Sequence, residues 1–191
     1  IFKEKNVEAI KVIQRRASLK ACLSGKEIDK GAIQQVLEAA RVAPSGRNQQ
    51  PSRIVVVNDK KIIDTLVKES FSEGNAIIAQ APVLIFICAN PKDSINRDGQ
   101  SYYLFDAGLA MENLLLAATD LGLATHPMTG FNEAKARQIL GIPEDIKIVA
   151  ATPLSCTSQS SYNEAAKDRL ASRTRKNLED IVFWNSWEAN K

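Results

Sequence analysis

The sequence is poor in the residues that most metal and hydrolytic sites use. It contains one histidine, His126, and three widely spaced cysteines among its 191 residues. One histidine excludes the usual zinc-ligand sets, and no G-x-S-x-G turn is present to support a Ser-His-Asp triad. Cys22, Cys88 and Cys156 have no metal-ligand spacing and suggest no disulfide framework. We therefore expect no metal site, and we expect Cys88 to be an inert core residue within an apolar run.

Long hydrophobic runs and strong net charge are also absent. The longest apolar run, residues 81–89, is far too short to cross a bilayer. The first residues read as a charged amphipathic helix rather than a signal peptide, so we expect a cytoplasmic protein. A net charge of +3 is too mild to indicate a nucleic-acid partner. The sequence begins at Ile1 rather than at methionine, which leaves open whether further residues precede it.

The remaining composition indicates one domain over residues 1–191. Hydrophobic residues make up 45% of the chain but aromatic residues only 6%, so the core should be mainly aliphatic. No G-x-G-x-x-G segment follows an expected strand, which argues against a Rossmann domain. We expect an α+β sandwich with helices around one mixed sheet.

Hydrophobic periodicity and turn residues place the elements. Asp29, Asp59 and Asn132 are the expected N-caps of three of the helices. Helices are expected at residues 6–16 (with Val7, Ile10 and Ile13 as its apolar stripe), 30–41, 59–68, 101–121, 133–140 and 178–187. Residues 74–80 could form one helical turn or more. Strands are expected at residues 54–57 (buried), 83–88, 124–128 and 146–152, and an exposed loop at residues 155–161. The 101–121 helix is too apolar for one face in water, so we expect it to be both the central core helix and part of a dimer interface.

The first candidate binding segment is Arg16-x-Ser18-x-Lys20. In an extended chain, alternate residues point the same way. A guanidinium, a hydroxyl and an ammonium group would then line one wall, as a phosphate and a ribityl chain require. The alternative is a solvated basic helix end.

The second candidate is the polar segment Pro44-Ser45-Gly46-Arg47-Asn48-Gln49-Gln50-Pro51. Gly46 permits close approach of the backbone to a ligand, and Ser45 and Asn48 offer polar groups to a ring edge. The alternative is an ordinary loop between a helix and a strand.

Two further segments complete the candidate site. In His126-Pro127-Met128-Thr129-Gly130-Phe131, backbone N–H groups could point at a ring nitrogen or oxygen, although the segment also reads as a simple connection. His126 alone is better explained as structural. Arg173-x-Arg175 adds two cations near the C-terminus, with a solvated charged tail as the alternative.

Together these segments resemble the FMN-dependent nitroreductases. Arg16-Ala17-Ser18-Leu19-Lys20 is similar to the N-terminal R-x-S-x-[RK] element of that family. Residues 38–51 resemble its E-A-A-x-x-A-P-S-x-x-N-x-Q-P element. Further similar segments are Ala81-Pro82, Asp106-x-Gly108-x-x-x-Glu112-Asn113, Leu121-Gly122-Leu123, Pro127-Met128-Thr129-Gly130-Phe131 and Arg173-x-Arg175-Lys176-x-Leu178-Glu179. The resemblance covers nearly the whole chain in the family's order.

The resemblance implies an α+β, nitroreductase-like sandwich with a mixed, mainly antiparallel sheet, in an intertwined homodimer that binds two FMN molecules at its interface. Arg16, Arg173 and Arg175 would hold the phosphate, Ser18 the ribityl chain or pyrimidine edge, and Lys20 would lie near ring N1 and O2. Pro44, Ser45 and Asn48 would come from the other subunit, while Thr129 and Gly130 would face N5 and O4. The implied cofactor-binding set is Arg16, Ala17, Ser18, Lys20, Pro44, Ser45, Gly46, Asn48, Asn75, Pro127, Met128, Thr129, Gly130, Arg173 and Arg175.

The implied activity is reduction of nitroaromatics, quinones or similar small acceptors by NADH or NADPH, with hydride transfer through flavin N5 and no catalytic side chain. Three positions depart from the family pattern: Ala17, Ser52 (where Trp is frequent) and Thr129 (where Glu or Gly is frequent). These departures put the substrate preference in doubt. The alternatives are a related flavin enzyme of the dehalogenase or ene-reductase type, a flavin-binding protein without turnover, and an interaction module whose basic ends bind an acidic partner.

Overall fold

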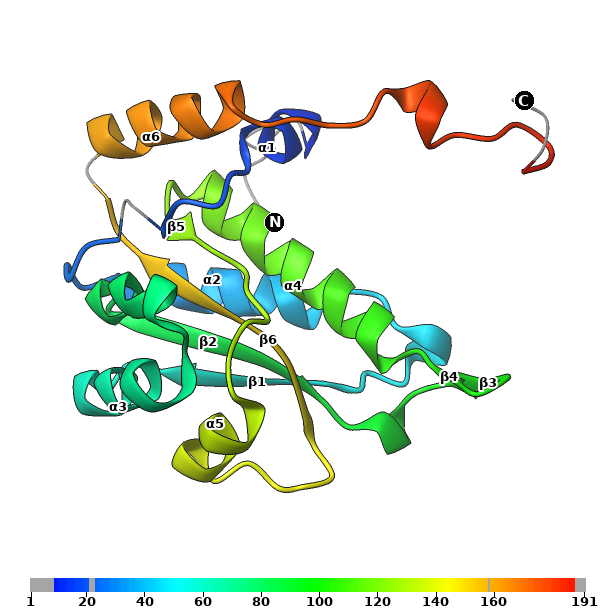
Figure 1. The fold of residues 1–191 in the computed structure, drawn as a ribbon, viewed down its shortest axis with the longest axis horizontal. Helices are drawn as coiled ribbons and strands as arrows, with labels where there is room; N and C mark the ends of the chain where they lie inside the picture. Colours follow the sequence, from blue (N-terminus) through cyan, green and yellow to red (C-terminus); the bar gives the residue numbers. More distant parts are fainter. Residues whose placement is uncertain (1–8, 21–22, 158, 188–191) are drawn as a thin grey trace.

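A four-stranded antiparallel sheet forms the centre of the structure, a computed structural model that describes residues 9–20, 23–157 and 159–187. Its strand order is β1 (Ser52–Val57), β2 (Val83–Ala89), β6 (Lys147–Ser155) and β5 (Ala124–Thr125). An isolated parallel bridge joins Ser18 to Thr125 at the β5 edge. The expected mixed, mainly antiparallel sheet is therefore confirmed (Figure 1).

Helices cover both faces of the sheet. The described helices are α1 (Ala9–Arg15), α2 (Lys30–Arg41), α3 (Lys60–Ser70), α4 (Tyr103–Asp120), α5 (Glu133–Leu140) and α6 (Gln159–Ala171). Short 3-10 segments occur at η2 (Gly46–Asn48), η3 (Glu73–Gln80), η4 (Pro91–Asp93) and η5 (Leu178–Asp180). A two-stranded hairpin, β3 (Asn96–Arg97) and β4 (Gln100–Ser101), projects just before α4 (Figure 1).

The expected helix caps are confirmed. The Asp29 carboxylate accepts hydrogen bonds from the N–H groups of Gly31 and Ala32, at 2.9 and 3.2 Å. Asp59 caps α3 in the same way, and the side chain of Asn132 accepts from Lys135 N. Each cap satisfies N–H groups that the first helical turn leaves unpaired.

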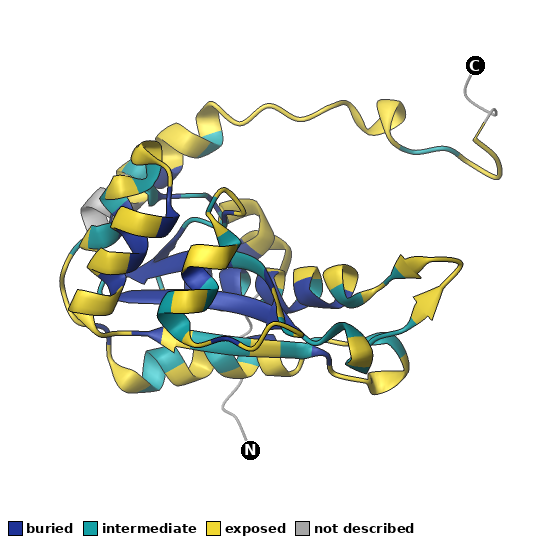
Figure 2. Cartoon of the chain, turned by 60° about the horizontal axis from the view of Figure 1, so that its bottom comes forward, coloured by how far each residue is buried: buried dark blue, intermediate teal, exposed yellow. Residues whose placement is uncertain are grey.

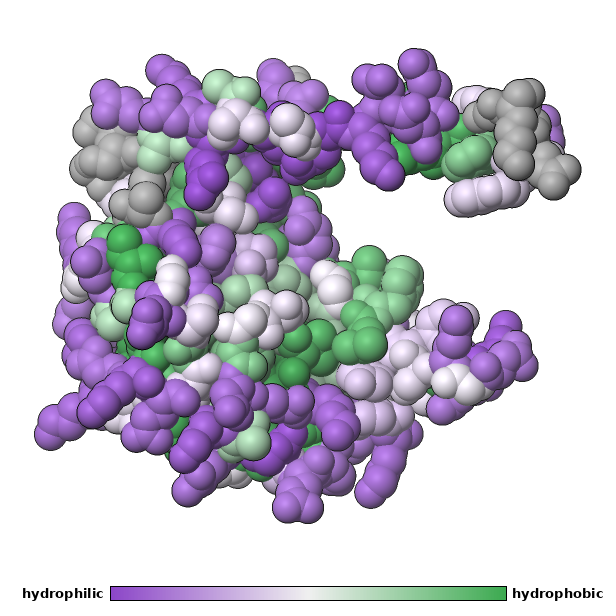
Figure 3. Space-filling model, viewed as in Figure 1, coloured by the Kyte–Doolittle hydropathy of each residue, from purple (hydrophilic) through white to green (hydrophobic). Residues whose placement is uncertain are grey.

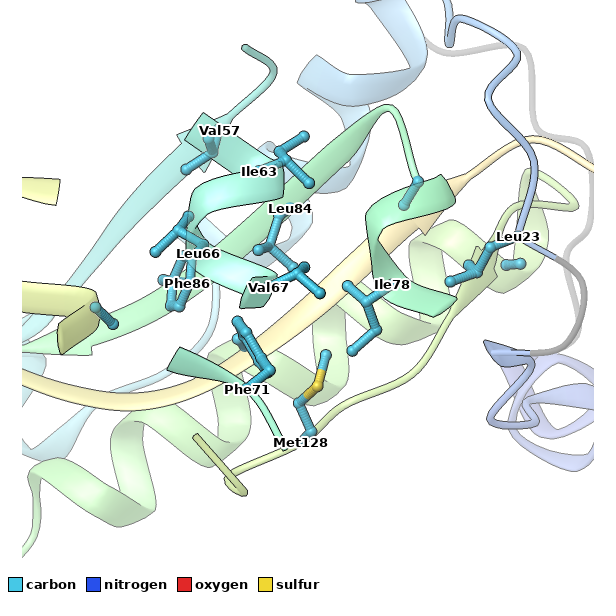
Figure 4. Packing of buried hydrophobic residues seen from close by; sticks show 14 of the residues in the cluster. Leu23, Val57, Ile63, Leu66, Val67, Phe71, Ile78, Leu84, Phe86 and Met128 are labelled. Carbon is cyan, nitrogen blue, oxygen red and sulfur yellow. The ribbon is translucent and has the colours of Figure 1, made fainter. Parts of the chain in front are cut away.

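Strand β2 separates two hydrophobic clusters and is buried throughout. Val83, Ile85 and Ile87 belong to the cluster shared with α2 and α4. Leu84, Phe86 and Cys88 belong to the cluster shared with α3 and α5, shown in Figure 4. Successive residues of a strand point to opposite faces, so one continuous apolar run serves both layers.

Cys88 is fully buried, as expected. Burial raises the pKa of its thiol to about 11, which keeps it protonated and unreactive at neutral pH.

Two expected apolar faces are wrong. Ile10 and Ile13 on α1 are 65% and 47% exposed, and Val12 is the buried residue instead. Residues 6–8 of that expected helix, including Val7, lie outside the described residues. β1 is only half-buried, because it is the edge strand of the sheet.

Two expected segments near the C-terminus are also wrong. The exposed loop expected at residues 155–161 gives way to the end of β6 and the start of α6. Ser155 is buried and its hydroxyl accepts a hydrogen bond from Ser24 N at 2.7 Å. The amphipathic helix expected at residues 178–187 is reduced to the three-residue η5. Short helices depend on packing of an apolar face, and in this segment Leu178, Ile181, Trp184 and Trp187 stay more than half exposed.

Candidate functional site

The segment from Arg16 to Lys20 runs extended beside β5. Ala17 and Leu19 point into the core, at 7% and 2% exposure, and Leu19 N donates to Thr125 O at 2.8 Å. The intervening Arg16, Ser18 and Lys20 are partly exposed. The alternation predicted from the sequence is therefore present, and the three polar side chains share one side of the segment.

Lys20 lies against η3. Its ammonium donates to Gly74 O at 2.6 Å and to Asn75 Oδ1 at 3.4 Å. Both acceptors are neutral, and no described carboxylate forms an ion pair with Lys20. The positive charge therefore remains available to an anionic ligand next to Asn75.

His126 lies within the electrostatic reach of Lys20 and Arg169. Burial lowers the pKa of its imidazole, and the charges of Lys20 and Arg169 lower it further. Its Nδ1 is buried without a hydrogen-bond partner among the described residues. At neutral pH the ring is uncharged, so the positive charge of this region comes from the lysine and arginine side chains.

The loop after β5 presents backbone N–H groups. Met128 is tied to Ala151 by two backbone hydrogen bonds of 2.9 Å, while Thr129 and Gly130 are exposed. The N–H groups of Thr129 and Gly130 form none of the backbone hydrogen bonds that hold this loop. Nothing lies within 4 Å of the position where Gly130 would carry a Cβ. Pro127, which directly precedes Met128, is half-buried.

The loop from Ser45 to Gln50 is held in an unusual backbone conformation. Arg47, Asn48 and Gln50 have φ values of 52°, 57° and 51°, the left-handed region that non-glycine residues rarely adopt. Gln50 N donates to Ser45 Oγ at 2.9 Å and Asn48 N donates to Ser45 O at 2.9 Å, which close the loop on itself. Such concentrated strain is typical of binding sites, where the fold fixes a local conformation for a purpose.

Asp106 anchors this loop to α4. Its Oδ1 accepts a hydrogen bond from Gly46 N at 3.2 Å, and the residue is only 2% exposed. Gly46 itself packs closely on Ile95, because a Cβ added there would lie 2.7 Å from Ile95 Cδ1. Pro44 and Ser45 line a cavity of about 300 Å³ between this loop, α2 and α4, whereas the side chain of Asn48 stands exposed.

The basic segment and the strained loop contact different parts of α4. Arg15 pairs with Asp120 at 3.5 Å and Arg16 approaches Glu112 at 3.9 Å, whereas the loop is bound to Asp106. Arg16, the first cation of the basic segment, therefore meets α4 six residues after Asp106, about 9 Å along the axis at 1.5 Å per residue.

Arg173 and Arg175 lie in the exposed segment that follows α6. Arg175 donates to Thr174 O at 2.6 Å, and neither arginine forms an ion pair with a described residue. Figure 1 shows this segment running out beyond the body of the molecule on the α1 side. Both guanidinium groups are free to bind an anion.

Sequence reasoning missed two contributors to the positive region. The carbonyl oxygen of Gly74 fixes the ammonium group of Lys20. A backbone acceptor of this kind cannot be recognised from residue types. Arg169 belongs to α6, a helix that the serine-rich composition of its first turn concealed.

Among the described residues, no group of three or more His, Cys, Asp and Glu side chains is placed to hold a metal ion. Nor does the described part of the chain contain a helix both long and apolar enough to span a bilayer.

The fold and these segments define an α+β protein with a basic, amide-rich binding region, and sequence comparison identifies its family. The sequence model of the nitroreductase family matches residues 13–77 and 72–154. A relative from Archaeoglobus fulgidus, named a putative NADH dehydrogenase/NAD(P)H nitroreductase, is 32% identical over 85% of this chain and 93% of its own length. This chain belongs to the nitroreductase family.

Solved structures agree with this assignment. The crystal structure of a nitroreductase family protein from Clostridium novyi NT is 31% identical, with a TM-score of 0.75 over 82% of this chain and 88% of that one. A structure described as an oxidoreductase containing FMN has a TM-score of 0.76 at 25% identity, and covers 97% of this chain and 95% of that one. The α+β nitroreductase-like fold predicted from the sequence is therefore confirmed.

Proposed function

We propose that this protein is an FMN-dependent oxidoreductase that uses NADH or NADPH to reduce nitroaromatics, quinones or similar small acceptors. The observation that carries the proposal is the ammonium group of Lys20, which is fixed by Gly74 O and Asn75 Oδ1 and has no ion-pair partner among the described residues. A homologous fold contains FMN, and the Archaeoglobus relative is named for NAD(P)H and nitro reduction.

The described residues fit FMN in charge and in hydrogen-bonding capacity. Arg16, Arg173 and Arg175 would hold the phosphate through charge-assisted hydrogen bonds. Ser18 would bond the ribityl chain, and Thr129 and Gly130 would donate from the backbone to the ring edge. Lys20 would stabilise negative charge beside the ring, a preorganised electrostatic contribution.

FMN, when bound, supplies the hydride-transfer chemistry, so no nucleophilic side chain is required. The chain contributes orientation and field: Lys20 is fixed by Gly74 O, and the strained loop holds Ser45 and Asn48 in one conformation. The single histidine stays neutral and is not assigned a proton-transfer step.

The site is proposed to form between two copies of the chain. An antiparallel pair of chains packed along α4 would bring the loop of one, bound at Asp106, onto the basic segment of the other, which contacts Glu112. Pro44, Ser45 and Asn48 would then reach the FMN held by the partner subunit. A homodimer would contain two such sites.

Two measurements test this proposal. The purified protein should be yellow, or become so with FMN, and its visible bands should bleach when NADH or NADPH is added without oxygen. A colourless protein that does not take up FMN would contradict the proposal. A flavin that neither nucleotide bleaches would favour the binding protein without turnover, and a panel of acceptors would separate nitro and quinone reduction from dehalogenation or ene reduction.

Subunit mixing tests the two-chain site. Lys20→Gln and Asn48→Ala chains should each bind FMN weakly alone. Unfolded and refolded together, they should give mixed dimers with one intact site, built from Lys20 of one chain and Asn48 of the other. A site formed within one chain would show no such recovery.

A further inference from the structure

The hairpin of β3 and β4 holds an arginine in a fixed register. Arg97 pairs with Gln100 across the hairpin, directly before the two-residue turn of Asp98 and Gly99. Both turn residues have positive φ, 53° and 78°, as a type I′ turn requires, and such turns match the twist of the flanking strands. Figure 2 shows the hairpin in the exposed colour, projecting from the buried sheet. The turn therefore presents Arg97 at a defined position on an exposed element.

Arg97 lines a cavity of about 220 Å³ at the N-terminal end of α4. The residues around this cavity are Gly46, Ile95, Arg97, Tyr102, Phe105 and Asp106. Tyr102 and Phe105 are 39% and 62% exposed, so their rings leave apolar surface open to a ligand. Figure 3 shows hydrophobic side chains gathered at this end of α4, next to the hydrophilic tip of the hairpin. A few polar groups among apolar walls are typical of small-molecule sites.

The walls of the cavity are held together within one chain. Tyr102 N donates to Ile95 O at 3.0 Å, which closes the base of the hairpin onto the start of α4. Gly46 packs so closely on Ile95 that a Cβ there would lie 2.7 Å from Ile95 Cδ1. The Ser45–Gln50 loop, the hairpin and α4 therefore meet around a preformed cavity.

No carboxylate neutralises Arg97 by contact. Its guanidinium forms neither a hydrogen bond nor an ion pair with a described residue, although Asp98 is its neighbour in the chain. Asp106 presents no free acceptor to the cavity, because Oδ1 accepts from Gly46 N and Oδ2 is inaccessible. Arg47, the exposed residue after Gly46, is likewise unpaired among the described residues. The N–H donors of Arg97 are therefore available to an anionic ligand.

The size and lining of the cavity define the ligand further. A cavity of roughly 150 Å³ is enough to bind benzene, so this one accommodates a single benzene ring with small substituents. The rings of Tyr102 and Phe105 favour an aromatic ligand over an aliphatic one. A planar guanidinium binds a carboxylate through two parallel hydrogen bonds. The ligand that meets these conditions is a one-ring aromatic carboxylate.

The place of the cavity relates it to the reaction, and this step rests on the proposed function. The Ser45–Gln50 loop is the segment proposed to reach the FMN held by the partner subunit. Gly46 of the same loop forms one wall of the cavity. A ring held against Gly46 is therefore next to the segment that contacts the flavin.

We propose that this cavity binds the electron acceptor, and that Arg97 selects acceptors made of one aromatic ring that carries a carboxylate. Reduction of a nitro group on such a ring to a nitroso group takes up one hydride, supplied by NADH or NADPH, and one proton, and releases one water molecule. Arg97 takes no part in that transfer. It determines which acceptor is held.

Two acceptors of nearly the same shape, 4-nitrobenzoate and 4-nitrobenzamide, test the selection because they differ in charge. The quantity to compare is the ratio of kcat/KM for the benzoate to that for the benzamide, since intrinsic reactivity cancels between parent and variant. Arg97→Gln should lower this ratio by about 10-fold or more through KM for the benzoate, the effect of one charge-assisted hydrogen bond. Arg97→Lys should restore part of it. Lys92→Gln removes an equal charge from η4, outside the cavity, and should leave the ratio unchanged.

Calorimetric titration of oxidised, FMN-loaded protein without nucleotide measures binding apart from turnover. The parent should bind 4-nitrobenzoate more tightly than Arg97→Gln does, by the same factor as in the kinetics. Phe105→Ala should weaken the benzoate and the benzamide alike, because it removes ring surface rather than charge. Equal affinity of parent and Arg97→Gln for the benzoate would overturn the selection.

This inference and the proposed function fail in different ways. A protein that binds FMN and is bleached by NADH or NADPH, but whose ratio is the same in parent and Arg97→Gln, would overturn the inference and leave the proposed function standing. A protein that takes up no FMN would overturn the proposed function, and with it the acceptor role of the cavity.

Discussion

The ammonium group of Lys20 is fixed by the backbone carbonyl of Gly74, 54 positions further along the chain, at 2.6 Å. The contact joins the basic segment to η3 and holds a positive charge beside Asn75 and His126. No described carboxylate forms an ion pair with Lys20, so its positive charge is not neutralised within the chain and is available to a ligand.

The first prediction concerns this lysine. Lys20→Gln should weaken FMN binding by roughly 10- to 100-fold, which corresponds to the 1.5–3 kcal/mol of a hydrogen bond to a charged group. Titration of the FMN-free protein, followed by quenching of flavin fluorescence, measures this. Lys61→Gln, on the exposed side of α3, is the matched control and should bind as the parent does. An unchanged affinity in Lys20→Gln would remove Lys20 from the site.

A second prediction concerns Arg175, in the exposed segment that follows α6. Arg175→Ala should also lose roughly 1.5–3 kcal/mol of FMN affinity, because its guanidinium pairs with no carboxylate of the described residues and is assigned to the phosphate. Riboflavin, which lacks the phosphate, should bind parent and variant alike. Lys60→Ala, which removes an exposed pair with Asp64 on α3, provides the control. Equal loss of riboflavin and FMN affinity would show that Arg175 acts on the fold instead.

The third prediction is a pH dependence of stability. Burial, then the charges of Lys20 and Arg169, lower the pKa of His126 from its usual value near 6.5. The unfolded chain therefore binds the proton more tightly, so the free energy of unfolding should fall as the pH drops below 6.5 and level off below the folded pKa.

Urea unfolding of FMN-free protein at about pH 7.5 and about pH 5.5 measures this effect, whose slope for one group is at most about 1.4 kcal/mol per pH unit. His126→Gln should be the less pH-sensitive protein. Parallel pH profiles for parent and variant would show that His126 titrates as an exposed histidine does.

The sequence predicted the parts of this fold that depend on local signals. Asp29 and Asp59 cap the helices they were expected to cap, since a carboxylate at that position satisfies N–H groups of the first turn. The alternation of Arg16, Ser18 and Lys20 with buried Ala17 and Leu19 also followed from the period of an extended chain.

Features that depend on distant contacts could not be predicted in this way. Ile10 and Ile13 have helical spacing, yet Val12 is the residue that packs. The expected helix at residues 178–187 failed for a similar reason, because its large apolar side chains stay mostly exposed and do not stabilise a helix by packing. The contact of Lys20 with Gly74 O left no trace in the residue types, because its acceptor is a backbone oxygen.

The last prediction concerns strain in the Ser45–Gln50 loop. Arg47 has φ 52°, whereas its neighbour Gln49 has an ordinary φ of −74°. Glycine at Arg47 relieves left-handed sterics worth about 1–2 kcal/mol, which offsets the roughly 0.5–1 kcal/mol of extra backbone entropy that glycine loses on folding. At Gln49 only the entropic cost remains, so Gln49→Gly should be less stable than Arg47→Gly by about 1 kcal/mol or more. Chemical denaturation of the two FMN-free variants measures the difference, and equal stabilities would mean that the loop relaxes out of the left-handed region in solution.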